Sequence, residues 1–120
     1  MEGMLEAELA RPLSEVKAEL FRALAHPARV RVLEILAVDE RSVRDLQPLV
    51  GIEMSHLSQQ LAVLRRAGLV TTRKVGSSVF YAIRDPELVR LLASAKQLLI
   101  NSLAASQELL SSLRVDAVRP

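Results

Sequence analysis

Apolar residues recur at helical spacing along the first part of the chain. Between Leu9 and Leu24, leucine and valine return every three or four residues, which places them on one face of a helix. This pattern predicts an amphipathic helix over about residues 12–25. The pair His26-Pro27 ends it, because a residue before proline is displaced from the α conformation. A second helix is predicted over about residues 28–37, with its apolar positions directed inward.

Two shorter helices with a tight turn between them are predicted next. Ser42 followed by Asp45 forms a capping box, which predicts a short helix that Gly51 closes. The next helix is predicted over about residues 54–67, and Gly68 ends it. Two short helices joined by a turn of this kind form a helix-turn-helix, an arrangement that can place the second helix in the major groove of DNA.

The helix predicted over residues 54–67 has two contrasting faces. Leu57, Leu61 and Leu64 share one face, so we expect them to enter the core. The opposite face carries small, hydroxyl and amide side chains and no acid, whereas an ordinary solvated face more often shows Glu and Lys pairs. This face is therefore predicted to hydrogen-bond base edges in a major groove about 12 Å wide. The candidate base contacts are Ser55, His56, Ser58 and Gln59.

Runs of β-branched and aromatic residues flank Gly76-Ser77 and predict a β-hairpin over about residues 69–83. A two-stranded ribbon is marginal alone, so we expect this hairpin to lean on the helices. A hairpin directly after a recognition helix is the wing of a winged helix, and Arg73 and Lys74 on it favour contact with phosphates or the minor groove. The alternative is an ordinary structural hairpin whose basic residues meet only water.

A long, leucine-rich helix is predicted at the end of the chain. Asp85-Pro86-Glu87 opens it, and it runs over about residues 86–114, a length of about 42 Å. Its leucine stripe is wide enough for two neighbours, so we predict a dimer interface shared with the first helix. A membrane-surface helix would instead carry basic residues on its polar face. The predicted interface residues are Leu13, Val16, Leu20, Leu92, Ala95, Leu99 and Leu103.

Length and charge add to this picture. The chain of 120 residues is long enough for one core and short for two, so we predict a single domain over residues 1–120. The elements predict a mainly α fold with a β-hairpin wing, a winged helix-turn-helix that is dimeric through its first and last helices. The net charge is only +2, yet the window from Met54 to Arg84 contains no acid. Within it, Arg65 and Arg66 are predicted to hold the DNA backbone.

The composition excludes several kinds of chemistry. No cysteine is present, which rules out disulfides, thiolate zinc sites and a cysteine nucleophile. No nucleophile–base pair or clustered glycines stand out, so we predict a protein that is not an enzyme and has no cofactor. The acidic start of the chain lacks a long apolar run, and the longest charge-free stretch has 11 residues, against roughly 20 for a membrane span. We therefore expect a cytoplasmic protein with no membrane partner.

Two segments resemble the ArsR/SmtB-type winged-helix regulators. Residues 24–33, LAHPARVRVL, are similar to the family's opening motif, and residues 57–70, LSQQLAVLRRAGLV, are similar to its recognition-helix signature. Tyr81 and its neighbours resemble the second wing strand, and the resemblance covers about residues 15–100. It implies the element order α-α-α-α-β-β-α in a cytoplasmic homodimer. Such a protein would bind double-stranded DNA at an inverted-repeat operator, as a repressor that an effector releases.

The chain departs from the family at its metal sites. Metal-sensing members carry two cysteines where this chain has Ser42 and Arg44, and arginine cannot ligate a metal. The last helix has no histidine or carboxylate between Leu88 and Ser106, so the family's other common metal site is missing too. For the effector, the open alternatives are nickel or zinc held by His26 and N-terminal glutamates, an organic molecule between the long helices, a separate effector-sensing protein, or none. A rival prediction is a protein-interaction module that keeps the winged helix.

Overall fold

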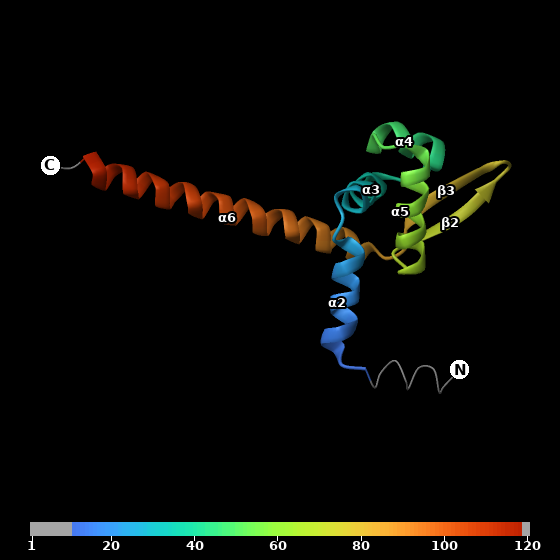
Figure 1. Ribbon diagram of the computed structural model, residues 1–120, viewed down its shortest axis with the longest axis horizontal. Coiled ribbons are helices and arrows are strands. Elements are labelled where there is room, and N and C mark those ends of the chain that lie inside the picture. Colours follow the sequence, from blue (N-terminus) through green and yellow to red (C-terminus); the bar gives the residue numbers. More distant parts are fainter. Residues whose placement is uncertain (1–10, 119–120) are drawn as a thin grey trace. The chain divides into compact units, whose positions relative to one another are not determined.

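The computed structural model describes residues 11–118, with side chains described as far as Arg114 (Figure 1). The chain divides into two compact units, one that ends at Asp85 and one that begins at Pro86. The predictions that involve Leu9, the acidic start of the chain and the glutamates before Arg11 fall outside the described residues.

The helices of the first unit follow the predicted pattern closely. They are α2 (Leu13–Leu24), α3 (Pro27–Val38), α4 (Val43–Val50) and α5 (Met54–Arg66). Each predicted helix is present, and its ends agree with the prediction to within about one residue. Between α4 and α5, Gly51 has a φ of +78°, a left-handed conformation that glycine adopts without strain. The predicted helix-turn-helix is confirmed.

Side chains cap the starts of two helices, at Ser42 as the sequence predicts and also at His26. His26 caps α3, and its Nδ1 accepts a hydrogen bond from the backbone N–H of Ala28 at 3.0 Å. Ser42 caps α4, and its Oγ accepts from the backbone N–H of Asp45 at 3.1 Å. Both bonds satisfy N–H groups that have no partner within the helix, which explains why α3 and α4 begin at these positions.

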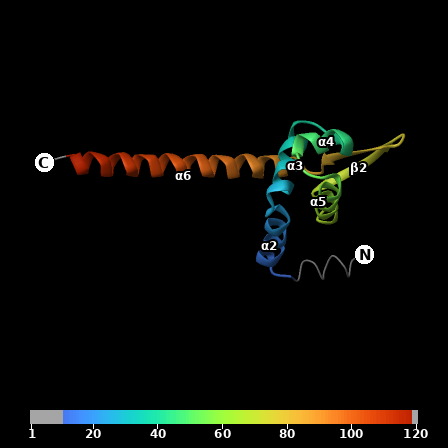
Figure 2. The ribbon, with the colours of Figure 1, turned by 45° about the horizontal axis from the view of Figure 1, so that its top comes forward.

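The wing belongs to an antiparallel sheet with the strand order β1-β3-β2. β2 (Val70–Val75) pairs with β3 (Ser78–Ile83) along their whole length. Gly76, with a φ of +60°, occupies the turn between them, where a positive φ suits the twist of a hairpin. The views in Figures 1 and 2 both show the β2–β3 hairpin extending away from the helices.

A third strand, β1 (Arg41–Ser42), corrects the expectation of a two-stranded ribbon. It pairs with β3, Arg41 opposite Tyr81 and Ser42 opposite Phe80. A segment of two residues is too short to show an alternation of polar and apolar side chains. Only its pairing with β3 makes it a strand. The strand anchors the wing directly to the N-cap of α4, in addition to any packing on helices.

The core of the first unit lies where α3 contacts α4 and α5. Leu57, Leu61 and Leu64 on α5 are at most 1% exposed, as their shared face predicts. Leu33 of α3 and Leu46 of α4 are fully buried as well. Each such leucine stabilises the fold by about 1.5–3 kcal/mol relative to an exposed position. Burial of this face fixes which side of α5 remains open to solvent.

The second unit is α6 (Pro86–Val118), a helix of 33 residues that extends past its predicted end. The large apolar side chains exposed along it are Leu98, Leu99, Ile100, Leu103, Leu109, Leu110 and Leu113. By length and mean hydropathy alone, Pro86–Arg114 would also suffice to cross a membrane, which the short charge-free stretch did not predict. Lys96 lies within it, and a lysine at the centre of a bilayer costs about 2.5–3.5 kcal/mol, which argues against that use.

Candidate nucleic-acid interface

The face of α5 opposite the core leucines is open to solvent. Ser55, Ser58 and Gln59 are exposed, and His56 is half-buried. α5 contains no acidic residue, so this face repels neither phosphates nor the acceptor-rich edges of bases. The structure thus places the predicted base contacts on one rigid helix, where their hydroxyl and amide groups can donate and accept hydrogen bonds.

A groove lies between α5 and β3. It has a cavity volume of about 490 Å³ and is lined by Ser58, Ala62, Arg65, Arg66 and Tyr81. The methyl side chain of Ala62 takes up little space, while two guanidinium groups and two hydroxyl groups contribute hydrogen-bond donors. Such a donor set matches the oxygens of a phosphate. The groove therefore brings together three of the predicted contacts with one polar residue that was not predicted.

Tyr81 is that residue. It lies on the central strand of the sheet, opposite Arg41 on β1 and Thr72 on β2, and it is half-buried. A tyrosine combines an apolar ring, which packs, with a hydroxyl that stays available for hydrogen bonding. The strand pattern revealed an aromatic residue in the wing, but it carried no information about which helix faces that strand.

Arg73 on β2 is exposed, but its guanidinium already forms contacts within the protein. Its guanidinium pairs with the Glu40 carboxylate, Nε donating to Oε2 at 2.9 Å and Nη2 donating to Oε1. The same guanidinium lies over the ring of Phe80, 4.9 Å from the ring centroid, a cation–π arrangement. The hydrogen bond from Arg73 lowers the pKa of the Glu40 carboxyl, and the positive charge of Arg73 lowers it further. A DNA phosphate that approaches Arg73 therefore competes with Glu40.

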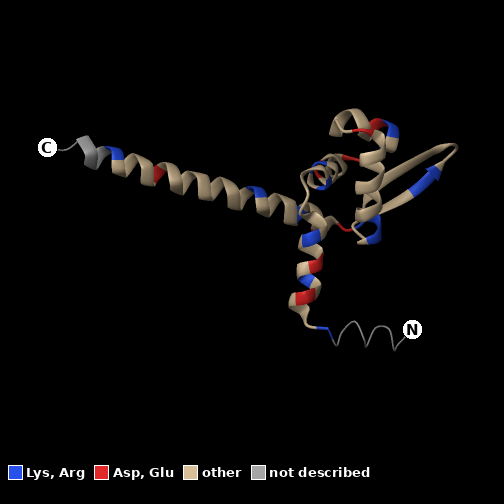
Figure 3. Cartoon of the chain, in the orientation of Figure 1, with Lys and Arg blue, Asp and Glu red and all other residues tan. Residues whose placement is uncertain are grey.

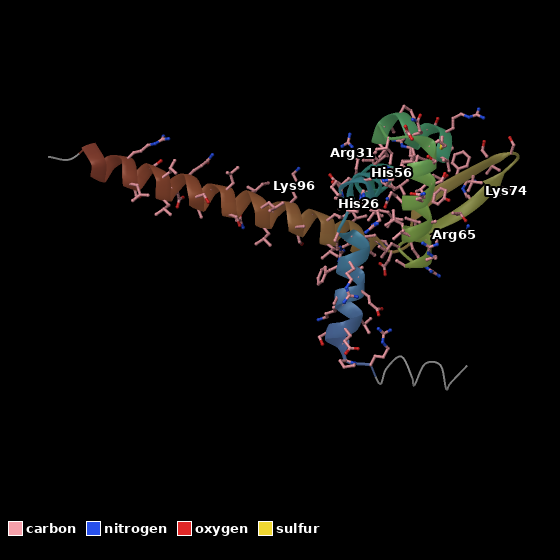
Figure 4. All side chains as sticks on the ribbon, viewed as in Figure 1. His26, Arg31, His56, Arg65, Lys74 and Lys96 are labelled. Carbon is pink, nitrogen blue, oxygen red and sulfur yellow. The ribbon has the colours of Figure 1, made fainter. Side chains whose placement is uncertain are left out.

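Lys74 is placed differently from Arg73. It is exposed, and no residue within the described part of the chain hydrogen-bonds or pairs with its ammonium. Figure 3 shows basic residues on β2 and at the C-terminal end of α5. Figure 4 places Lys74 on the hairpin and Arg65 on α5, so both elements that are predicted to meet DNA carry positive charge.

The two histidines of the chain meet each other. The ring centroids of His26 and His56 are 5.7 Å apart and the ring planes are at 82°, an edge-to-face contact (Figure 4). Because His26 Nδ1 accepts a hydrogen bond, the proton of the neutral ring lies on Nε2. Across residues 11–118, no group of three His, Cys, Asp or Glu side chains is close enough together to hold a metal ion.

The predicted interface residues leave much apolar surface uncovered in the single chain. On α2, Leu13 is 66% exposed, whereas Val16 and Leu20 are half-buried. Phe21, which the sequence analysis did not include, is 55% exposed on the same helix. On α6, Leu92 is half-buried, and the exposed members of the predicted set are Ala95, Leu99 and Leu103. Large exposed apolar surfaces of this kind usually mark contacts with another molecule.

Known proteins resemble this chain in sequence and in fold. Residues 26–72 match the family described as bacterial regulatory protein, arsR family. The HTH-type transcriptional regulator Rv0081 of Mycobacterium tuberculosis is 48% identical over 104 residues, which cover 86% of this chain and 91% of that protein. The crystal structure of Rv0081 matches with a TM-score of 0.75, over 81% of this chain and 98% of that chain.

Two further relatives have more informative descriptions. The biofilm growth-associated repressor of Agrobacterium fabrum is 39% identical over 89 residues, 71% of this chain and 76% of that protein. A solution NMR structure of Mb0332 from Mycobacterium bovis is described as a homodimeric winged helix-turn-helix DNA-binding domain. It matches with a TM-score of 0.66 and 30% identity, over 72% of this chain and 80% of that chain. The predicted winged helix-turn-helix fold is confirmed.

Proposed function

Since the chain belongs to the ArsR family of bacterial regulatory proteins, we propose that it is a sequence-specific DNA-binding transcriptional repressor that binds an inverted-repeat operator as a homodimer. The observation that carries this proposal is the surface of α5. An acid-free polar face adjoins a groove in which Arg65, Arg66 and Tyr81 converge. Within the same family, the relative from Agrobacterium fabrum is named a repressor, which supports the direction of regulation.

Base readout is assigned to the exposed side chains of α5. A helix fits the major groove of B-DNA, and amide side chains there discriminate between base pairs because each pair presents a distinct set of donors and acceptors. Gln59 is the strongest candidate, since its amide is exposed and can donate to and accept from adenine at once. Ser55, His56 and Ser58 flank it on the same helix.

Backbone contacts are assigned to the groove and to the wing. Arg65, Arg66 and Tyr81 line the groove, and their guanidinium and hydroxyl groups can donate hydrogen bonds to a phosphate. Lys74, with its exposed ammonium, is free to approach a second phosphate from the hairpin. Such contacts hold the protein in register on the duplex and supply most of its salt-dependent, sequence-independent affinity.

Dimerisation is assigned to α2 and α6. Their exposed apolar side chains include Leu13, Phe21 and Leu103. A second copy of the chain offers the same apolar surface, so a homodimer can bury both surfaces against each other. Two-fold symmetry would present the two α5 helices to successive major grooves about 34 Å apart, which matches an inverted repeat. The homodimeric description of the Mycobacterium bovis relative supports this assembly. A DNA-binding regulator of this kind acts in the cytoplasm.

Selection of binding sites from a random double-stranded DNA library tests the proposal. We expect the protein to enrich an inverted repeat, with affinity that falls steeply between about 50 and 200 mM salt. Enrichment of half-sites in a single orientation, or no enrichment, would contradict it. Retention of another protein at the α5 face, with no DNA selected, would instead support the rival interaction module.

The effector is proposed to be something other than a metal bound through thiolates. Ser42 is only 7% exposed and its Oγ caps α4, while Arg44 carries a guanidinium that repels cations. The remaining alternatives are a separate effector-sensing protein, an organic molecule between the long helices, no effector, and nickel or zinc bound through His26. Titration of the operator complex with each metal tests the last of these. Release by metal in the natural chain, abolished in His26→Asn, would support the metal, because asparagine retains the cap of α3.

A further inference from the structure

Arg29 joins three helices through one side chain. Its Nε donates to the backbone carbonyl of Ala23 at 2.7 Å, and its Nη2 donates to the carbonyl of Arg22 at 3.1 Å. Its Nη1 donates to Oε1 of Gln60 at 2.9 Å. Arg29 itself lies on α3, the two carbonyls end α2, and Gln60 lies on α5. One guanidinium therefore connects the end of α2 with the recognition helix.

The two carbonyls explain why this position needs an arginine. The last carbonyls of a helix lack their regular α-helical partners, and the negative end of the helix dipole attracts a cation. The Arg22 carbonyl also accepts a hydrogen bond from the backbone N–H of Ala25 at 3.1 Å. A guanidinium carries five N–H donors in one rigid plane, so it can serve the carbonyls and still reach Gln60. A lysine ammonium has a single nitrogen, which cannot span these three acceptors in the same geometry.

Gln60 is an unusual residue for its location. It is only 8% exposed, on the face of α5 that also buries Leu57, Leu61 and Leu64. A buried amide without a hydrogen bond is costly, so the bond from Arg29 fixes the orientation of this side chain. Gln59, the adjacent residue, is exposed and is the strongest candidate for base contact. Gln60, which Arg29 holds in place, and Gln59, the candidate base contact, are thus consecutive residues of one helix.

A second contact joins the same two helices about one turn away. His26, three residues before Arg29, meets His56, four residues before Gln60, with their rings edge to face. Figure 4 shows the two labelled histidines beside each other. α5 is therefore attached to α3 at two points along its length, and contacts at two points restrict rotation and tilt more than a contact at one point does.

We propose that Arg29 and Gln60 form a positioning link that sets the orientation of the recognition helix relative to α2. This inference rests on the proposed function, in which α2 is a dimerisation helix and α5 reads DNA. In a dimer, the orientation of α5 against α2 determines where the two recognition helices lie relative to each other. The link therefore controls the operator spacing that the dimer accepts, although neither side chain is a candidate for base contact.

Three variants test this link. Gln60→Met keeps the length of the side chain and removes the acceptor for Arg29, whereas Gln60→Glu keeps an acceptor and adds an ion pair. Arg29→Lys keeps the charge and loses the planar fork. Each is measured against the selected operator, against operators with the half-sites moved by one base pair, and against random DNA, with Tm recorded for every variant.

We expect Gln60→Met and Arg29→Lys to lose about tenfold affinity for the natural spacing, the size of one lost buried hydrogen bond, and to discriminate less between spacings. Random DNA is expected to bind unchanged, and Gln60→Glu to retain the natural preference. Natural spacing discrimination in Gln60→Met, or a loss that follows Tm and is equal on all DNA, would overturn the proposal, because both indicate ordinary core packing.

Hydrogen–deuterium exchange without DNA separates the link from the proposed function. We expect amides of α5 and of the C-terminal end of α2 to exchange faster together in Gln60→Met, while Gln60→Glu retains the natural protection. Protection of α5 that does not change in Gln60→Met overturns the link even where DNA is bound. If the natural chain selects no DNA, the proposed function fails, and the exchange experiment still decides whether Arg29 and Gln60 position α5.

Discussion

Glu40 and Arg73 form an ion pair between the residue that precedes β1 and the wing strand β2. This ion pair involves Arg73, one of the basic residues that the sequence analysis predicts to contact DNA. Because Arg73 also lies over Phe80 on β3, its side chain is held at the sheet while its charge is balanced by Glu40. Glu40 thus lowers the positive potential of the wing in the free protein.

Glu40→Gln is expected to tighten binding to every DNA sequence. Without the carboxylate, Arg73 becomes available to a phosphate, and each added phosphate contact steepens the dependence of log K on log salt by about 0.9. Fluorescence anisotropy over a salt series measures both quantities. Glu34→Gln, which removes an exposed acid from α3, is the matched control. Equal effects of the two variants would mean that Glu40 acts only through net charge.

The same pair predicts a limited dependence of stability on pH. The hydrogen bond from Arg73 lowers the pKa of Glu40 below its ordinary value of 4.5, so the folded state favours the carboxylate. This stabilisation is complete above about pH 4.5 and is lost as the pH falls through the lowered pKa. The Tm difference between the natural chain and Glu40→Gln, measured from neutral to acidic pH, should shrink to zero at the acidic end. A difference that persists there would point to packing and not to charge.

Tyr81→Phe tests the proposed phosphate contact in the groove. It removes only a hydroxyl, so we expect affinity for operator and random DNA to fall together, by about 0.5–1.5 kcal/mol. The Tm should stay close to that of the natural chain, because the ring and its position on β3 are retained. Loss confined to the operator would make Tyr81 a base contact instead, and no loss would remove it from the interface.

Gln59→Ala tests base readout. We expect a cost of roughly 1–3 kcal/mol on the selected operator and little change on random DNA, since the amide contributes only where it meets its base. Gln107→Ala, at an exposed position on α6, controls for the loss of an amide elsewhere. Equal weakening on both kinds of DNA would show that Gln59 contacts the backbone.

Leu103→Glu tests whether α6 forms the dimer interface. Leu103 is 61% exposed in the single chain, and a carboxylate there would be desolvated in a dimer interface. We expect light scattering to report a monomer and the inverted repeat to bind far more weakly, whereas Gln97→Glu on the polar side leaves the dimer intact. Flotation with lipid vesicles provides the opposing outcome: association of the natural chain with vesicles would assign the stripe to a membrane.

Several predictions succeeded because their causes are local. The helix ends at His26 and Ser42 depend on side chains that cap the backbone two or three residues away, and periodic leucines reveal the buried face of α5. β1 escaped prediction because a two-residue strand has no period, and its pairing partner Tyr81 lies about 40 residues further along the chain.

The sequence by itself determined the helix-turn-helix, the wing and the acid-free face of α5, because spacing, caps and composition are properties of neighbouring residues. Only the tertiary structure decided which charges remain available to a partner. Arg73 and Lys74 are adjacent and look alike in sequence, yet Arg73 meets Glu40 from another segment, while Lys74 stays exposed. Likewise, Gln59 and Gln60 are the same residue type, yet the packing of α5 leaves Gln59 exposed and buries Gln60, which accepts a hydrogen bond from Arg29. Contacts between distant segments depend on how the helices pack, which the local pattern does not specify.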